Sequence, residues 1–340
     1  MSFPNEIRVA NLALSYNKSK HIQIATFQNN DELASWYKSF KKIRPSNWIA
    51  KKDLPAIVLS SLVDSYYLLP ERPDMAFPFL WSGINSIYND LYISKLPASA
   101  KTVKDSDGID AAAGLIVSVL DDEIPLGIKK FGRDKITIRD LLKEYIAKAE
   151  TRNLNYAAST YLKGYAISNH NATCAPHDCI RKILISQSYK TALNKFKDLH
   201  DHICATAGTK YLANSTINEN SDKTDCEIKP VNNDYSRKIT HAIGEEIRTL
   251  TISANPTFFA SDNVWILFIV HTFLYSSRNS AIHGNSTSRI NSAHFDKDHV
   301  KSAIWTYKIG YCVLSILLYI RKDATLTDLK VLYANIASPL

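Results

Sequence analysis

Hydrophobic positions recur at helical spacing along almost the whole chain from residue 30 onward. In the clearest run, which follows Met75, bulky apolar residues recur three or four positions apart as far as Leu91. A helix of 3.6 residues per turn places such positions on one face, so the run predicts a long amphipathic helix. The same spacing predicts further helices over residues 30–43, 55–69, 110–120, 137–148, 155–168, 178–204, 235–250, 262–283, 296–321 and 328–337, of which 178–204 is expected to be interrupted.

These helices leave little room for a sheet, and the sequence predicts an all-α protein. The helix near residue 80 and the two long apolar helices near the C-terminus are expected to form the densest core. Residues 214–233 are polar and acidic, and they are expected to be a loop or tether. Residues 6–28 follow neither helical nor strand spacing clearly.

Composition narrows the class of protein. Hydrophobic residues make up 45% of the chain and charged residues 22%, which is typical of a globular protein, and only ten glycines argue against turn-rich β folds and glycine-rich nucleotide loops. An excess of 41 Lys and Arg over 33 Asp and Glu gives a net charge of +8 and weakly favours a polyanionic partner such as nucleic acid.

Location is predicted from the cysteines and from the longest apolar runs. Five cysteines, an odd number, and an N-terminus without secretion-signal character favour reduced thiols and a cytoplasmic protein. The apolar runs over 264–270 and 313–320 are too short to span a bilayer, so no membrane partner is expected.

The strongest candidate for chemistry lies at the end of the predicted helix 262–283. Arg278 and His283 stand five positions apart, Asn279 directly follows the arginine, and Gly284 is suited to end the helix. A guanidinium can neutralise charge that develops on a phosphate, and an imidazole that titrates near neutral pH can move a proton to or from RNA hydroxyls. Capping of the helix is the alternative, and a second pair, Arg289 and His294, shows how readily the bare spacing occurs.

The segment Arg278-Asn279-Ser280-Ala281-Ile282-His283 resembles the Arg-x4–6-His motif of the HEPN (higher eukaryotes and prokaryotes nucleotide-binding) superfamily. Family members place this motif at the end of one long apolar helix and follow it with another, here expected over 300–319. An earlier family helix carries a pattern similar to that of Leu80, Trp81, Asn85 and Tyr88, preceded by Phe77 and Phe79.

The resemblance implies a metal-independent endoribonuclease that acts on single-stranded RNA and leaves a 2′,3′-cyclic phosphate. Arg278, His283 and Asn279 would be the catalytic residues, a homodimer would bring two motifs into one cleft, and no cofactor would be needed. The family recurs in phage defence and in toxins, so an antitoxin or regulatory partner is a further expectation. A non-catalytic helical module that binds RNA or protein is the alternative.

Domain boundaries also follow from the resemblance. Residues 53–340 would form the HEPN-like helical bundle, with a long and largely helical insertion at about 96–234, after a partly ordered N-terminal segment, 1–52. Asn285 occupies the position two residues after the histidine, where some family toxins carry a tyrosine that is modified with AMP, which argues against that regulation here.

The stretch over residues 33–52 is basic, lacks acids and is interleaved with aromatic residues. Basic residues can follow a phosphate backbone while aromatic rings stack on bases. The alternative, which the pattern favours, turns the aromatic residues to the core and the lysines to water. The candidate RNA-binding residues are Lys38, Lys41, Lys42, Arg44 and Trp48.

Other charged and metal-binding residue types have weaker patterns. A second basic stretch over 129–139 and an acidic cluster over 121–123 are equally consistent with solvated surfaces. Glu245 and Glu246 could contribute to a cleft, but the sequence does not fix which way their side chains point. The cysteines and histidines near residue 175 do not follow a standard zinc spacing, so no metal site is expected. That cluster comprises His170, Cys174, His177 and Cys179, with His200, His202 and Cys204 as residues that can complete it.

Overall fold

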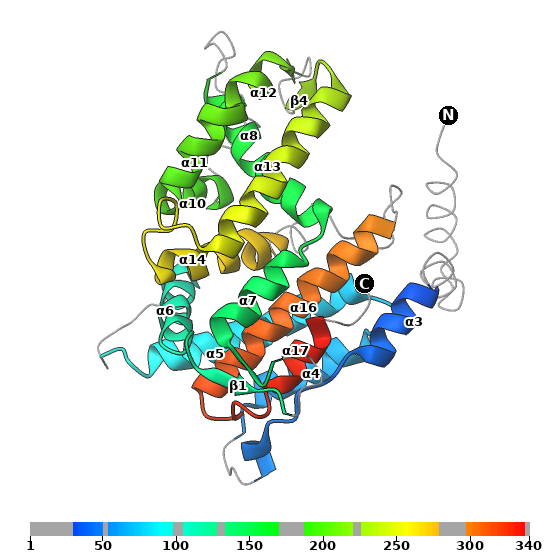
Figure 1. The fold of residues 1–340 in the computed structure, drawn as a ribbon, viewed down its shortest axis with the longest axis vertical. Helices are drawn as coiled ribbons and strands as arrows, with labels where there is room; N and C mark the ends of the chain where they lie inside the picture. The colour runs from blue at the N-terminus through cyan, green and yellow to red at the C-terminus, as the bar shows by residue number, and fades with distance from the viewer. Residues whose placement is uncertain are drawn as a thin grey trace. The chain divides into compact units, whose positions relative to one another are not determined.

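The computed structural model describes residues 30–49, 54–97, 105–127, 133–169, 187–219, 226–278 and 297–336. Helices dominate these residues, and the prediction of an all-α fold is confirmed (Figure 1). The chain forms two compact units, one built from residues 1–150 and 277–340 and the other from residues 151–276. The boundaries expected at residue 53 and at about 96–234 stay predictions.

The first unit is built around two long helices that pack against each other. Its elements are α3 (Asn30–Ser39), η1 (Ser46–Ile49), α4 (Ala56–Tyr67), α5 (Pro73–Ile93), α6 (Asp105–Val117), the antiparallel pair β1 (Glu123–Pro125) and β2 (Lys135–Thr137), α7 (Ile138–Ala147), α16 (Lys297–Ile320) and α17 (Lys330–Ile336). Helix α5 packs against both α4 and α16. Most of the predicted helices are therefore present, although α3 ends at Ser39 rather than at residue 43.

Helix α16 is the core of the first unit. The segment Asp298–Ile320 is long and apolar enough to cross a membrane, but 89% of its most apolar window is buried inside the protein. Its apolar surface therefore packs against the rest of the chain, as in the core helix of a globular fold. Gly310 allows the close approach to α5, because a Cβ atom there would lie 2.8 Å from the ring of Phe77.

Buried polar groups tie the segment after α3 to the C-terminal part of the unit. The amide of Asn335, which is fully buried, accepts a hydrogen bond from the Lys41 backbone N–H at 2.7 Å and donates one to the Lys41 carbonyl at 2.9 Å. The hydroxyl of Tyr311, on α16, accepts a hydrogen bond from the Ile43 N–H at 2.7 Å. These bonds satisfy the backbone of a segment that has no secondary structure of its own.

The second unit is a helical layer that carries one hairpin. Its elements are α8 (Thr151–Ser168), α10 (Gln187–Lys195), α11 (Lys197–Ile203), η2 (Cys204–Gly208), α12 (Thr209–Ala213), β3 (Ser215–Glu219), β4 (Cys226–Pro230), α13 (Asn233–Ser253), α14 (Asp262–Phe268) and η3 (Ile269–Tyr275). Helices α8 and α13 pack closely, and Gly244 permits this because a Cβ atom there would lie 3.1 Å from Leu154.

The structure differs from the sequence prediction at residues 214–233. The expected loop contains the antiparallel hairpin β3–β4, in which Ile217 faces Ile228 across the register. The short runs Thr216–Ile217 and Glu227–Lys229 alternate in polarity, which suits a half-exposed strand. High polarity alone therefore misidentified this segment.

Replacing Asn335 with leucine tests the link between the two ends of the first unit. Asn335→Leu would remove these partners of the part-buried N–H and carbonyl of Lys41, and we expect the free energy of unfolding to fall by about 1–3 kcal/mol. Chemical denaturation measures this loss. The control Asn169→Ala removes an exposed amide at the end of α8 and should change stability by less than about 0.5 kcal/mol. An equally small effect at both positions would contradict the assignment.

Candidate functional site

Arg278 lies in the helical stretch that begins with α14, and it is the last described residue of that stretch. Ser261 caps this stretch, its side chain accepting a hydrogen bond from the Val264 N–H, and Asp262 adds a negative charge in the first turn. The helix continues through η3, a π-helix, to Arg278, whose side chain is half-buried. Arg278 therefore follows a buried helical segment, and its predicted position at the end of the helix stays a prediction.

The other two candidate catalytic residues, Asn279 and His283, lie outside the described residues, as do Gly284, Asn285 and the second pair, Arg289 and His294. Their placement relative to Arg278 stays a prediction. The structure thus supplies the helix that leads into the motif and one of its three candidate side chains.

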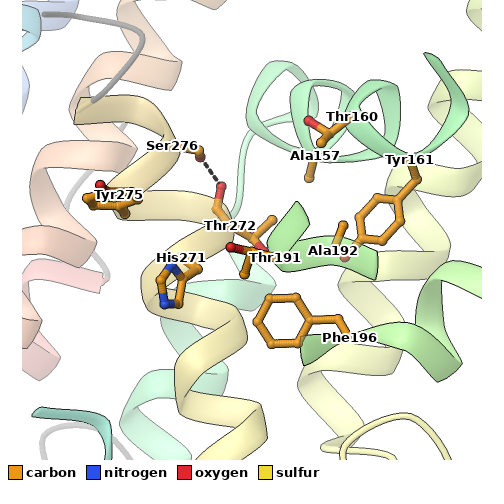
Figure 2. Close-up of a pocket in the computed structure, with 10 residues that line it drawn as sticks. All are labelled: Ala157, Thr160, Tyr161, Thr191, Ala192, Phe196, His271, Thr272, Tyr275 and Ser276. Atoms are coloured by element: carbon orange, nitrogen blue, oxygen red, sulfur yellow. Dashed lines mark hydrogen bonds between the residues drawn. The ribbon is translucent and has the colours of Figure 1, made fainter. Parts of the chain in front are cut away.

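The π-helix η3 changes the surface that the motif helix buries. A π-helix adds a residue to the turn, and such segments are frequent at functional sites. All seven residues from Trp265 to His271 are buried, which a regular amphipathic helix would not achieve. Behind it lies a cavity of about 20 Å³, lined by α8, α10, Phe196 and η3 (Figure 2). This volume holds about one water molecule, so the cavity is too small for a nucleotide.

The residues of α5 that carry the family resemblance are structural. Leu80, Trp81 and Tyr88 are buried, and Trp81 and Tyr88 contact each other at 6.4 Å between ring centroids. Asn85 accepts a hydrogen bond from Asn89 on the next turn. These contacts explain how α5 packs in the first unit.

The basic and aromatic segment after α3 forms one wall of a groove. Trp36 and Phe40 are buried and contact Tyr307 of α16, where the core alternative placed them, while Lys38, Lys41, Lys42 and Arg44 are exposed. The opposite wall comes from residues just before and within α17. We call this feature the cationic groove, and it is lined by Tyr37, Phe40, Lys41, Lys42, Arg44, Thr327, Asp328, Lys330 and Val331.

The cationic groove has a volume of about 540 Å³, within the range of about 300–1,000 Å³ that is usual for ligand sites. Three of the five candidate RNA-binding residues line it, whereas Lys38 and Trp48 do not. Lys330 and Asp328 belong to the same groove, and they were not among the candidates. No pattern near residue 330 indicated that it would meet residues 41–44, since the two segments are almost 290 positions apart.

Asp328 fastens the two walls of the groove together. Its Oδ2 atom accepts hydrogen bonds from the backbone N–H and the hydroxyl of Ser46, at 3.1 and 2.8 Å, and from the N–H and hydroxyl of Thr325, at 2.8 and 3.0 Å. Burial raises the pKa of this carboxyl, but these hydrogen bonds outweigh it and hold the pKa below its usual value. Asp328 is therefore ionised at neutral pH, with its charge directed to these four donors.

The described part of the second basic stretch forms ion pairs with nearby carboxylates, whereas Lys129 and Lys130 lie outside the described residues. Lys135 pairs with Glu123 at 2.7 Å and Arg139 with Asp121 at 3.0 Å across the β1–β2 hairpin and its ends. Arg133 in turn lies 3.5 Å from Glu144. These three basic side chains have carboxylate partners, whereas no such partner is found among the described residues for the lysines of the cationic groove, so the three are poor candidates for a polyanion site.

Of the candidate metal ligands that the structure describes, His200 and Cys204 lie 3.5 Å apart, from Nε2 to Sγ, whereas His202 is directed to another residue. His200 is buried between Tyr161 and Tyr189, whereas the Nε2 atom of His202 meets Glu246 at 2.6 Å. Burial raises the pKa of Cys204 to about 12, so its thiol stays protonated. Among the described residues no group of three or more His, Cys, Asp or Glu side chains is placed to hold a metal. The cluster His170, Cys174, His177 and Cys179 lies outside those residues.

Comparisons of the chain with protein-family models, with curated proteins and with solved structures find no match. The resemblance to the HEPN superfamily therefore rests on the residues of the motif and on the order of the helices around it.

Lys308 is a buried titratable group outside these candidate sites. It lies on α16 with 4% of its surface exposed, and burial lowers its pKa from 10.5 to about 8, with Glu150 opposing and Lys148 reinforcing the shift. A lysine with a pKa near neutrality is a candidate for proton transfer. However, Lys308 lines neither the cationic groove nor the cavity beside η3, so we assign it to the core.

Stability measured against pH tests this description of Lys308. Between about pH 8 and pH 10 the unfolded chain holds a proton on this lysine that the folded protein lacks, so its contribution makes stability rise with pH. We expect Lys308→Met to remove that rise and to stabilise the protein by about 1–3 kcal/mol at pH 7. Urea denaturation at several pH values measures both effects, with the partly exposed Lys301→Met as the control. A parallel pH profile for wild type and Lys308→Met would refute the assignment.

Proposed function

We propose that the protein is a metal-independent endoribonuclease that cleaves single-stranded RNA. The observation that carries this proposal is that Arg278 directly follows the buried helical segment of α14 and η3, in a sequence that continues as Asn279 and, four residues later, His283. The all-α fold and the long helix α16 that follows the motif are consistent with the HEPN-like architecture that the motif implies.

The proposed reaction uses groups that the chain itself supplies. The 2′-OH of the substrate attacks the adjacent phosphorus, the bond to the 5′-oxygen breaks, and a 2′,3′-cyclic phosphate and a 5′-OH are formed. His283 would transfer a proton, Arg278 would stabilise the negative charge that develops on the phosphate, and Asn279 would orient the pair. Unpaired RNA is the substrate that we favour, because its 2′-OH and bases are accessible.

A biological role in phage defence or as a toxin follows from the same resemblance, as does control by an antitoxin or regulatory partner, whereas a cytoplasmic location rests on the odd number of cysteines. A second candidate function is a non-catalytic module that binds RNA. The cationic groove favours this alternative, because such a groove can bind a polyanion whether or not the motif is active.

Cleavage of labelled single-stranded RNA in EDTA separates the two functions. We expect Arg278→Ala and His283→Ala each to lower the cleavage rate by at least about 100-fold while the proteins remain folded, because each removes charge stabilisation or proton transfer in the transition state. The wild-type products should carry cyclic phosphate ends.

The chain offers a matched control in its second Arg-x4-His pair. Arg289→Ala and His294→Ala remove the same residue types at the same spacing and should cleave at close to the wild-type rate. Equal activity in all four variants would contradict the proposed catalytic residues. A wild-type protein that binds RNA without cleaving it, with or without metal ions, would favour the binding module.

Dimerisation is a separate part of the proposal. Two motifs that share one cleft require a homodimer, so sedimentation velocity at the concentrations used for cleavage should show a dimer, with activity falling as dilution dissociates it. A strict monomer with full activity would remove the shared cleft and leave one motif as a complete site.

A further inference from the structure

We propose that the cationic groove binds the phosphate backbone of single-stranded nucleic acid, through residues distinct from the Arg278 motif. The choice of RNA as the natural polyanion rests on the proposed function, whereas the groove as an anion site rests on its own geometry. It would hold the strand, and the motif would carry the chemistry.

The charge of the groove is the first argument. Lys41, Lys42 and Arg44 contribute three cations from one wall, and Lys330 contributes a fourth from the other. All four side chains are exposed, and within the described residues none of them forms a salt bridge. Asp328 is the one acid among the lining residues, and its four hydrogen bonds with Ser46 and Thr325 turn its charge toward the wall.

The rigidity of the walls is the second argument. The backbone of Lys41 is held on both its N–H and its carbonyl by Asn335, and Ser46 is held by Asp328. The Asn47 amide adds a hydrogen bond to the Lys322 carbonyl at 3.0 Å. The two walls are therefore fixed before a ligand arrives, which reduces the ordering cost of binding to the side chains alone.

The aromatic residues decide which part of a nucleic acid is recognised. Phe40 is 6% exposed and packs on Tyr307 and Tyr311, so it offers no free face to a base. Tyr37 is half-buried, and the Lys42 ammonium lies 5.2 Å from its ring centre and donates to its hydroxyl at 3.0 Å. The groove therefore offers little aromatic surface on which a base can stack, and phosphates are the groups that it can recognise.

Binding of a strand that cannot be cleaved tests the groove apart from the chemistry. A fluorescein-labelled 2′-O-methyl RNA lacks the attacking hydroxyl, and its affinity is measured by anisotropy over a range of salt concentrations. The variant combines Lys41→Ala, Lys42→Ala and Lys330→Ala, which leave the backbone bonds of the walls intact. The control combines Lys95→Ala, Lys163→Ala and Lys190→Ala, three exposed lysines whose loss changes the net charge equally.

We expect the groove variant to bind at least about tenfold more weakly and its slope of log affinity against log salt to fall by about 2, since each lost phosphate contact on a single strand removes about 0.7. The control should bind within about twofold of wild type. Single-stranded DNA of the same length should bind wild type about as well as the RNA, because phosphates alone are read.

The failure of this inference is distinguishable from that of the proposed function. If wild type does not bind, or if the groove and control variants bind equally, the groove is not a nucleic-acid-binding site. Weakened binding in the groove variant alone would support it even if Arg278→Ala and His283→Ala left cleavage unchanged. Conversely, if the groove variant binds RNA normally while Arg278→Ala is inactive, the groove is not the RNA-binding site, and the proposal of a nuclease still stands.

Discussion

The first unit depends on the burial of α16. Each large apolar side chain fully removed from water contributes about 1.5–3 kcal/mol, and α16 buries such side chains on almost every face along its length. Burial on all sides also means that its polar groups need partners from other elements. Trp305 donates to the Tyr145 carbonyl at 2.9 Å, and Tyr319 donates to Asp122 at 2.8 Å. The helix is thus both the apolar centre and the point to which α7 and the β1–β2 region are attached.

The hydrogen bonds around the buried helix α16 also position the walls of the cationic groove at the edge of the unit. Tyr311 of α16 receives the Ile43 N–H and is hydrogen-bonded to Tyr66 of α4 at 2.7 Å, so the segment after α3 runs along the core helix. Tyr145 of α7 donates to the Leu332 carbonyl at 2.8 Å and holds α17 from the other side. Lysines that have no carboxylate partner among the described residues are brought together because the backbones that carry them are fixed to the core.

Helical spacing predicted the fold well and the interactions between distant segments poorly. The elements α4, α5, α7, α13 and α16 lie close to their predicted ranges, because burial of one face imposes a period that the sequence displays. The hairpin β3–β4 was missed, since its short strands carry few bulky apolar residues. The π-helix η3 was also missed, because one extra residue in a turn leaves the apolar pattern almost unchanged.

For the candidate sites, too, the sequence predicted local features better than contacts between distant segments. The helical segment that leads to Arg278 was predicted correctly, because it follows from local pattern alone. The roles of Asn335 and Asp328 required knowledge of residues almost 300 positions away. Likewise, the sequence left the roles of the basic and acidic stretches open, and only the structure shows that Lys135 of one pairs with Glu123 of the other.

The division of the chain has a consequence for its synthesis. The second unit, 151–276, is made before α16, whereas the first unit needs segments from both sides of it. A nascent chain therefore carries α5 with its apolar face uncovered until residues 297–320 emerge, and the second unit can fold in the meantime. This order delays assembly of the first unit, and with it the cationic groove, until residues 297–336 have been made.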